Sequence, residues 1–412
     1  MTILKKMMAG AAACALLLLV ACGGGGGGGT SGSGSTASGG STGAVGAGSS
    51  GTPSGKGTLR VSMTDAPACG YDAVNVTITK VRVHQSGSAD DGASGWVDIV
   101  LAQPQRVDLL TLTNGVLFPL GETPLPAGNY QQMRLVLAAN TQAAPLANSV
   151  KPTGGAEIPL DTPSAQQSGL KLNANVDVPS DQVVDVVLDF DACKSVVKRG
   201  NSGRYNLKPV ISVIPVVNSG GQRVEGWVDP SLAATSTLVS LQLQGLPVKS
   251  SIPDSTGRFV LFPVPIGNYS LVITAPRRVT AIITGVPVLS DTVTTIGSTS
   301  LRVNMNLSLM RSVTGTVSPA TGTVRALQVL SGGPTIQVDS PPVDALSGGF
   351  ETSLPIGAPI RAAYVPNPGA FGFADDTAVA GLYTVQASSN GIAQNADIDA
   401  NSVVPPLSFT LP

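Results

Sequence analysis

Short runs of alternating apolar and polar residues, separated by Gly and Pro, constrain the fold of this chain more than any other feature. Leu59, Val61 and Met63 alternate with polar residues and lead into a turn at Pro67. This alternation puts one set of side chains on a buried face and therefore predicts half-buried β-strands. The chain contains 49 Gly and 31 Pro, and its hydrophobic share of 42% is still sufficient for cores. We predict an all-β protein of many short strands, with at most a helical turn at residues 191–199.

One expected strand has an interrupted alternation. Val74, Val76 and Ile78 follow one phase, whereas Val81 and Val83 follow the other. A slip of one residue within a strand is what a β-bulge produces. We therefore expect a bulge in the middle of this strand.

The N-terminal residues have the organisation of a secretory signal. A basic region at Lys5 and Lys6 precedes an apolar stretch over residues 7–20, which is shorter than the roughly 20 residues of a membrane-spanning helix. The stretch ends in Leu19-Val20-Ala21-Cys22, directly before seven glycines, and this segment resembles the lipobox of bacterial lipoproteins. The resemblance implies that residues 1–22 are a lipoprotein signal peptide, that Cys22 carries a diacylated sulfur and that its new amine is acylated.

Several acyl chains on Cys22 would form a lasting membrane anchor, because each buried methylene contributes roughly 0.8 kcal/mol. Gly23 stands where enteric bacteria have the aspartate associated with inner-membrane retention, which favours the outer membrane of a bacterial envelope. An ordinary signal with an incidental cysteine is the alternative.

The residues after the anchor are almost wholly Gly, Ser, Thr and Ala over residues 23–57. Such a segment cannot bury enough apolar area to offset the entropy of ordering, so we expect a disordered, flexible linker. The remaining chain, about 350 residues, is long enough for two to three folded units.

Five separated motifs mark the region between residues 57 and 217. They are Thr64-Asp65-Ala66-Pro67, Asp108-Leu109-Leu110, Pro126-Ala-Gly-Asn-Tyr130, Asp189-Phe190-Asp191-Ala192 and Leu207-Lys208-Pro209-Val210. In this order they resemble the bacterial family called domain of unknown function 4382 (DUF4382). The resemblance implies an extracytoplasmic β-sandwich over residues 58–217, of a kind common on lipoproteins and without an established activity.

The rest of the chain contains a repeat. Val224-Glu-Gly226-Trp-Val228-Asp-Pro230 corresponds to Val313-Thr-Gly315-Thr-Val317-Ser-Pro319, and each copy continues with a Gly-x-Phe strand and a Pro-Ile-Gly turn. This scheme resembles carboxypeptidase-regulatory-like domains, which are small transthyretin-like sandwiches. The resemblance implies one sandwich over residues 222–308. It implies a second, divergent one over residues 312–412, which has Ala358-Pro359 where the first has Tyr269.

Two cysteines, Cys69 and Cys193, are left besides the acylated Cys22 after removal of the signal. In an oxidising envelope two leftover thiols in one domain should pair. The bridge would join the ends of two strands and contribute roughly 4–5 kcal/mol in the chain-entropy model. Unpaired thiols and a metal site are the alternatives, although zinc generally takes four Cys or His ligands and the chain has a single histidine.

This bridge would also bring Asp65 close to Asp189 and Asp191. Three carboxylates near one turn could hold calcium, which takes roughly six to eight oxygen ligands. In the alternative interpretation Asp65 caps a turn, and the other two end a strand through hydrogen bonds to the backbone. We predict no other cofactor.

No group of residues stands out as catalytic. His84 lies on an expected strand, and the folded region has no Gly-x-Ser-x-Gly elbow that a histidine base would serve, so we interpret it as a surface or strand-edge residue. The pairs Asp90-Asp91 and Asp375-Asp376 are formally compatible with a glycoside hydrolase. Both pairs lie in Gly-rich loops, where solvated turns are the usual interpretation.

The charge of the chain bears on its partners. Charged residues make up 12% and the formal net charge is -1, so no basic face is available for nucleic acid. We expect a lipid-anchored protein of the cell envelope that serves as a non-catalytic binding or structural module for an unknown protein or glycan. A surface carbohydrate-active hydrolase using Asp or Glu is one alternative, and an assembly partner that exchanges a strand is another.

Overall fold

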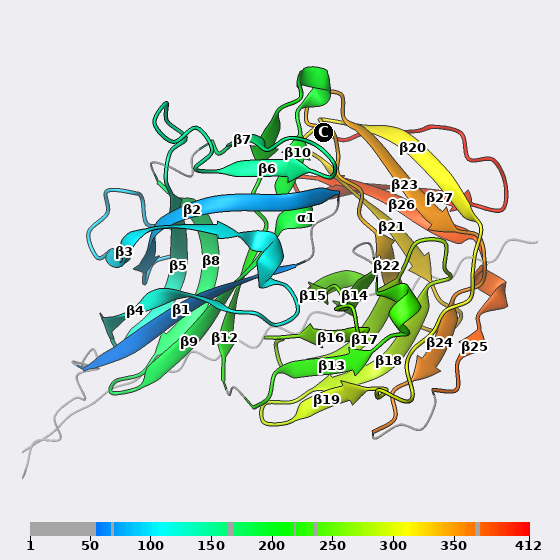
Figure 1. Cartoon of the computed structure of the whole chain (residues 1–412), viewed down its shortest axis with the longest axis horizontal. Helices are drawn as coiled ribbons and strands as arrows, with labels where there is room; N and C mark the ends of the chain where they lie inside the picture. Colours follow the sequence, from blue (N-terminus) through cyan, green and yellow to red (C-terminus); the bar gives the residue numbers. More distant parts are fainter. Residues whose placement is uncertain (1–54, 67–69, 164–167, 218–219, 234–236, 367–370) are drawn as a thin grey trace, which may run out of the picture. The chain divides into compact units, whose positions relative to one another are not determined.

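The computed structural model describes residues 55–66, 70–163, 168–217, 220–233, 237–366 and 371–412. The expected signal peptide with Cys22, nearly all of the expected linker and Cys69 lie outside these residues. All described residues belong to one unit, residues 51–412. Strands dominate it, and the short α1 (Ala192–Ser195) is the only α-helix among the described residues (Figure 1). The predicted class, all-β with β-sandwiches in series, is confirmed.

The first sandwich consists of two sheets. One has the order β12-β9-β1-β4 and the other the order β10-β11-β7-β6-β2-β5-β8, with β3 also paired to β2. Strand β1 is the organising strand of the first sheet, because it pairs parallel with β9 and antiparallel with β4. The strands are β1 (Lys56–Ala66), β2 (Tyr71–His84), β3 (Val97–Asp108), β4 (Phe118–Pro126), β5 (Gly128–Leu137), β6 (Ser149–Pro152), β7 (Ile158–Asp161), β8 (Leu170–Val178), β9 (Val183–Asp191), β10 (Val196–Lys198), β11 (Tyr205–Leu207) and β12 (Ile211–Val216).

The bulge expected in β2 is present. The register of β2 shifts between Ile78 and Lys80 against both β3 and β5. Because of this shift Val76 and Ile78 before the bulge, and Val81 and Val83 after it, are all completely buried. The bulge therefore keeps the apolar side chains before it and after it directed at the same core.

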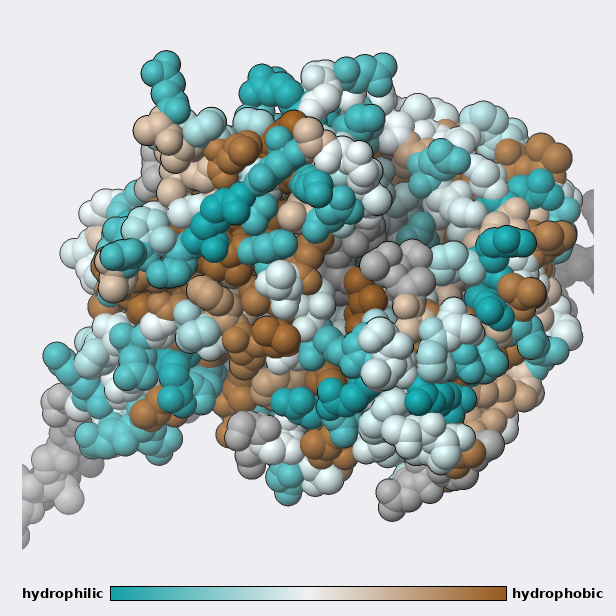
Figure 2. All heavy atoms as spheres, in the orientation of Figure 1, coloured by the Kyte–Doolittle hydropathy of each residue, from teal (hydrophilic) through white to brown (hydrophobic). Residues whose placement is uncertain are grey.

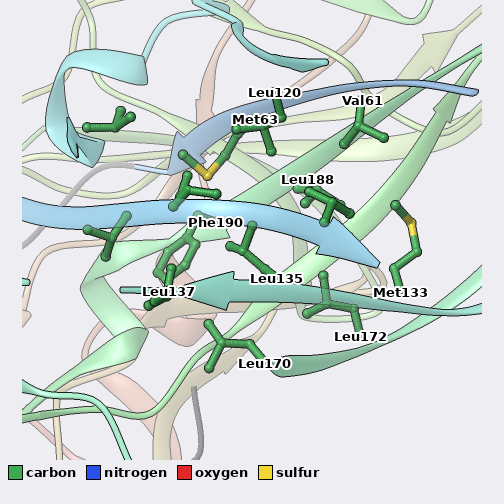
Figure 3. Close-up of a cluster of buried hydrophobic side chains, with 14 of the residues drawn as sticks. Val61, Met63, Leu120, Met133, Leu135, Leu137, Leu170, Leu172, Leu188 and Phe190 are labelled. Atoms are coloured by element: carbon green, nitrogen blue, oxygen red, sulfur yellow. The ribbon is translucent and has the colours of Figure 1, made fainter. Parts of the chain in front are cut away.

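The core of the first sandwich lies between its two sheets. Figure 3 shows side chains from β1 and β9 of one sheet gathered with side chains from β5 and β8 of the other. Phe190 of β9 and Leu135 of β5 are completely buried in this cluster. The labelled members are Val61, Met63, Leu120, Met133, Leu135, Leu137, Leu170, Leu172, Leu188 and Phe190.

The second and third sandwiches share one strand order. In each, a sheet of three strands has the first strand in the centre, antiparallel to the fourth strand and parallel to the last (β16-β13-β19 and β23-β20-β28). The other sheets correspond as well (β15-β14-β17-β18 and β22-β21-β26-β27). The strands are β13 (Arg223–Trp227), β14 (Leu238–Leu243), β15 (Leu246–Ser251), β16 (Arg258–Leu261), β17 (Gly267–Thr274), β18 (Ala281–Val288), β19 (Val293–Ile296), β20 (Met310–Ser318), β21 (Thr323–Val329), β22 (Thr335–Asp339), β23 (Gly349–Pro355), β26 (Leu382–Ser389), β27 (Ile392–Asp399) and β28 (Leu407–Thr410).

The third sandwich carries an additional segment after β23. Its strands β24 (Ile360–Ala363) and β25 (Ala374–Asp375) leave the third sandwich and extend the sheet of the second, where β24 pairs parallel with β18 (Figure 1). The described 3-10 turns are η1 (Leu109–Leu112), η2 (Gly200–Ser202), η3 (Pro230–Leu232) and η4 (Thr377–Val379).

This segment explains why the repeat diverges at Ala358-Pro359. In the second sandwich the Tyr269 hydroxyl donates to the Pro265 carbonyl at 2.8 Å. In the third, the Tyr383 hydroxyl donates to the Pro355 carbonyl at 2.6 Å, although Tyr383 follows the additional segment. The equivalent tyrosine is therefore retained, and it is displaced along the sequence by the inserted strands.

Candidate functional site: a cavity bordered by the three sandwiches

A cavity of about 570 Å³ is bordered by residues of all three sandwiches. The first sandwich contributes the segment around β11 and the second the start of β15. The third contributes the connection between β20 and β21, the start of β21 and the loop after β22. Much of the wall is apolar, and its apolar members include Leu207, Val210, Leu246, Val324, Pro341 and Val343. The volume falls within the roughly 300–1,000 Å³ that is usual for small-molecule sites.

Hydrogen bonds across the cavity wall hold the three sandwiches to one another. The Lys208 ammonium donates to the Thr321 carbonyl at 2.6 Å and so joins the first sandwich to the third. The Arg325 guanidinium donates to the Gly245 carbonyl at 3.3 Å and joins the third to the second. The wall thus consists of segments far apart in sequence that contact one another directly.

A buried amide adds a further contact between the second and third sandwiches. The Gln242 side chain donates to the Gln337 carbonyl at 2.8 Å and accepts from the Gln337 backbone N–H at 2.7 Å. The side-chain amide therefore pairs with the β22 backbone as a neighbouring strand would, and both residues are buried. Because both hydrogen-bonding groups of the amide are used, its burial is compensated.

A buried ion pair joins the first sandwich to the second. Lys249 of β15 donates to Asp189 of β9 at 2.5 Å, and the two side chains are 2% and 7% exposed. Burial raises the pKa of Asp189, and the charge of Lys249 opposes that shift. Such a pair fixes which surfaces meet, because either partner alone would leave an uncompensated buried charge.

Three cations border the cavity, namely Lys194, Lys208 and Arg325, and no Asp or Glu of the described chain does so. Lys194 is paired with Asp191 at 2.7 Å. Lys208 and Arg325 take part in none of the ion pairs found among the described residues. Partial burial lowers the pKa of both groups, because desolvation disfavours the charged form. The cavity therefore combines apolar walls with an excess of positive charge.

The three carboxylates considered for calcium point to opposite faces of a sheet. The parallel register of β1 and β9 pairs Asp65 with Phe190, so Asp65 faces the core, whereas Asp189 and Asp191 face the other side. Asp65 accepts from the Ala192 N–H at 3.0 Å, and burial raises its pKa well above the usual range. Asp191 caps α1 by accepting from the Lys194 N–H at 3.0 Å. The described residues offer these carboxylates no common calcium site, and no group of three or more His, Cys, Asp or Glu residues among them could hold a metal ion.

The predicted Cys69–Cys193 bridge stays a prediction, because Cys69 lies outside the described residues. Cys193 is half-buried in α1, two residues beyond the end of β9. The register places Ala66, the last residue of β1, beside Asp191, the last residue of β9. The chain therefore leaves both strands at the same end of the sheet, as the predicted bridge requires.

The histidine and one carboxylate of each Asp pair are engaged in local structure. The His84 ring accepts from the Ser86 N–H at 2.8 Å, and its Nε2 lies 2.9 Å from the Ser94 carbonyl. Asp91 pairs with the nearly buried Arg134. Asp376 accepts from the Ser331 N–H at 2.9 Å; burial raises its pKa, but its hydrogen bonds lower it more.

The cavity cations had no signal in the sequence as binding residues. Lys208 belongs to one of the motifs that resemble DUF4382, but the motif does not say what it faces. Arg325 and Lys249 are single charges on strands, and only their neighbours from other sandwiches give them a role. In the space-filling view, hydrophobic residues show over the first sandwich (Figure 2).

Comparison with known proteins relates one part of the chain to a family. Residues 56–209 match the family described as "Domain of unknown function (DUF4382)". The first sandwich carries a DUF4382 domain. The resemblance predicted from its five motifs is thus confirmed, and the DUF4382 domain supplies Asp189 and Lys208 to the contacts described above. No curated protein matches the chain.

Two solved structures are similar to a smaller part of the chain. Both are cohesin–X-dockerin complexes from Acetivibrio cellulolyticus, one an N-terminal and one a C-terminal interface mutant of a type II complex. Each matched chain is 23% identical to this chain in sequence. The match covers 21% of this chain and 59% of each matched chain, with TM-scores of 0.19 and 0.18. At these TM-scores the likeness carries no functional argument. None of the described helices is long and apolar enough to cross a membrane.

Proposed function

We propose that this chain is a lipid-anchored protein of the bacterial cell envelope. In this proposal the three sandwiches act as one non-catalytic binding module with its ligand in the cavity between them. The observation that carries the proposal is the cavity itself, because each sandwich supplies part of its wall. Concave, largely apolar sites with a few converging polar groups are where proteins usually bind small molecules.

The contacts around the cavity support a pre-organised site. The Asp189–Lys249 ion pair and the Gln242–Gln337 contact are buried and connect different sandwiches. A site held in this way loses little conformational freedom when it binds a ligand, so more of the contact energy is available as affinity. Three sandwiches that moved independently would have to be ordered by the ligand.

The attachment to the membrane rests on Leu19-Val20-Ala21-Cys22. Acylation at Cys22 would place the folded residues at the end of a linker of about 35 residues, with a root-mean-square span of roughly 30–35 Å if it is a flexible coil. Gly23 after the cysteine supports the outer membrane as the location. The folded part would then reach ligands near the membrane without inserting into it.

The second and third sandwiches are proposed to be carboxypeptidase-regulatory-like domains. Their shared strand order and the matching hydrogen bonds of Tyr269 and Tyr383 support this relationship. In the proposed module they contribute walls of the cavity, so they are more than spacers for the DUF4382 domain.

The anchor is tested by Cys22→Ser in the full-length chain expressed in a bacterial host. We expect the protein to move from the membrane fraction to the soluble fraction of the envelope, because serine cannot form the thioether. Continued membrane association of the variant would contradict the anchor. Gly32→Ser, in the expected linker, is the matched control and should leave the distribution unchanged.

The cavity is tested separately with Nile red, a neutral apolar dye whose fluorescence increases in apolar surroundings. Leu246 is 55% exposed at the cavity wall, so Leu246→Trp can fill the cavity without disturbing a core. We expect this variant to weaken dye binding at least tenfold. Leu289→Trp, at an exposed position away from the cavity, should bind the dye like the unchanged protein. Equal binding by both variants would exclude the cavity as a binding site.

A further inference from the structure

The two cations without carboxylate partners are placed around one segment of the cavity wall. Lys208 reaches from the DUF4382 domain to the Thr321 carbonyl in the connection between β20 and β21, and Arg325 lies four residues further along the chain, in β21 of the third sandwich. Within β21, Thr323 and Arg325 share one face, because side chains alternate along a strand. That face is the less buried one, whereas Val324 is buried. Two positive groups therefore border the cavity from two different sandwiches.

Both cations retain free hydrogen-bond donors. A lysine ammonium has three donors, and the Thr321 carbonyl accepts from Lys208. A guanidinium has five N–H groups, and Arg325 uses two of them for the Gly245 carbonyl and the Gln386 side chain. None of these three contacts neutralises a charge, because all three acceptors are neutral. A ligand oxygen with negative charge would gain charge-assisted hydrogen bonds that these neutral acceptors do not provide.

Carboxylates next to the cavity are engaged elsewhere. Asp191 and Asp339 line a small adjoining recess that shares Lys194 with the cavity. Asp191 is paired with Lys194, and Asp339 accepts from the Thr352 hydroxyl at 2.5 Å. Burial raises the pKa of Asp339, which weakens its tendency to carry a negative charge. Within the part of the chain that the structure describes, the positive charges of Lys208 and Arg325 thus have no carboxylate directed at them.

We infer that the cavity binds a free amphipathic anion, with its apolar body against the Leu207, Leu246 and Val343 wall and its acidic head between Lys208 and Arg325. This inference rests on the proposed binding function and adds the chemical class of the ligand. The head can be a carboxylate or a sulfate, since both present several acceptor oxygens to converging N–H donors. A neutral molecule of the same shape satisfies the apolar wall and leaves the two charges uncompensated. A cation of the same shape is repelled by both groups.

The experiment measures displacement of Nile red from the full chain carrying Cys22→Ser, which has no acyl chains that could bind the dye, by three probes that share one dodecyl chain. The probes are dodecanoate, dodecanol and dodecyltrimethylammonium, each below its micelle-forming concentration. We expect dodecanoate to displace the dye at a concentration at least tenfold lower than dodecanol, and dodecyltrimethylammonium to be the weakest. Equal potency of dodecanoate and dodecyltrimethylammonium would overturn the inference.

Charge variants assign the selectivity to named residues. Lys208→Glu combined with Arg325→Glu should reverse the order, so that dodecyltrimethylammonium displaces the dye at a lower concentration than dodecanoate. Lys171→Glu, on an exposed position of β8, is the matched control and should leave the order unchanged. If the control reverses the order as well, the effect belongs to the overall charge of the protein and the inference fails.

Two further results separate this inference from the proposed function. If Leu246→Trp abolishes dye binding but the three probes are equally potent, the cavity binds apolar molecules without charge selection, and only the inference is lost.

Phosphatidylglycerol vesicles test the source of the anion, because they present acidic heads on a bilayer surface. We expect the Cys22→Ser protein, which lacks the acyl anchor, to stay in the supernatant when these vesicles are sedimented. Co-sedimentation, together with no displacement of the dye by free dodecanoate, would contradict a free ligand. Arg325→Gln controls for misfolding, because the uncharged amide keeps hydrogen-bonding groups. We expect this variant to retain dye binding and to need an about fivefold higher concentration of dodecanoate for displacement of the dye.

Discussion

The second sandwich is joined to its two neighbours in different ways. Its junction with the DUF4382 domain contains a buried pair of opposite charges, Asp189 and Lys249. Its junction with the third sandwich is a continuous sheet, because β24 pairs with β18, and the Gln242 amide adds a second backbone-like contact. The first junction includes a side-chain pair that depends on protonation, whereas the contacts named for the second junction are hydrogen bonds that do not titrate. This difference predicts that pH and side-chain changes affect the two junctions unequally.

The largest effect is expected from breaking the charged junction. Lys249→Ala leaves Asp189 as a buried carboxylate without its counter-charge, and such changes cost about 3–5 kcal/mol. We expect the free energy of unfolding in urea to fall by that amount. Combining Asp189→Asn with Lys249→Met should restore most of the loss, because neither replacement carries a charge. A loss below about 1 kcal/mol for Lys249→Ala would mean that water reaches the pair and screens it.

The sheet junction is tested by a proline in β24. Ile360 donates its backbone N–H to the Thr280 carbonyl and Tyr364 donates to the Thr284 carbonyl, so the N–H of the alternate residue Ala362 also faces β18. Ala362→Pro removes that donor and should lower the free energy of unfolding by about 2–3 kcal/mol, the cost of an unmade buried hydrogen bond. Ala363→Pro places the same ring one residue later, where the N–H faces away from β18. Equal losses for the two variants, measured by urea denaturation, would contradict a contribution from the β18–β24 ladder.

The buried carboxyl group of Asp65, in the DUF4382 domain, makes the stability of the protein depend on pH. Burial raises its pKa well above the usual range, so the folded state binds this proton more tightly than the unfolded state does. Its contribution to stability is therefore complete below the unfolded pKa of about 3.9 and is lost as the pH rises through the raised folded pKa. We expect Asp65→Asn, which can keep the hydrogen bond from Ala192, to stabilise the protein at pH 8 and to have little effect near pH 4. Stability curves against pH for both proteins measure this, and parallel curves would contradict it.

The smallest effect is expected where the second and third sandwiches are alike. Tyr269→Phe and Tyr383→Phe each remove one hydroxyl that donates to a proline carbonyl. Each should lower the free energy of unfolding by about 1 kcal/mol, the usual net contribution of one hydrogen bond. A much larger loss for Tyr383→Phe would show that this bond also holds the inserted strands β24 and β25 in place.

The sequence predicted the strands better than the contacts between them. The alternation of Leu59, Val61 and Met63 predicted a half-buried strand, and the interrupted alternation around Ile78 predicted a bulge, and both are present. Alternation reports which face of a strand is buried, and that information is local. The sequence also predicted a repeat, but it placed the missing tyrosine near Ala358-Pro359. The structure shows Tyr383 in that role after an insertion, which no fixed spacing could reveal.

The candidate site could not be predicted in the same way. The three aspartates near the ends of β1 and β9 were grouped from their expected proximity, but the parallel register turns Asp65 away from Asp189 and Asp191. Register decides the face of a side chain, and a shift of one residue reverses it. Neighbouring strand ends were therefore insufficient to define a shared ligand site.

The sequence by itself determined the all-β class, the DUF4382 resemblance and the expectation of a lipid anchor at Cys22, because periodicity, composition and short motifs are written in consecutive residues. Only the tertiary structure decided that Lys208 and Arg325 border one cavity and that Lys249 neutralises Asp189. These residues lie on different sandwiches, and their meeting depends on how whole sheets pack. The physical reason is that a strand specifies its own buried face by local alternation, whereas the partner of an isolated charge is selected by surfaces that come together only in the folded chain.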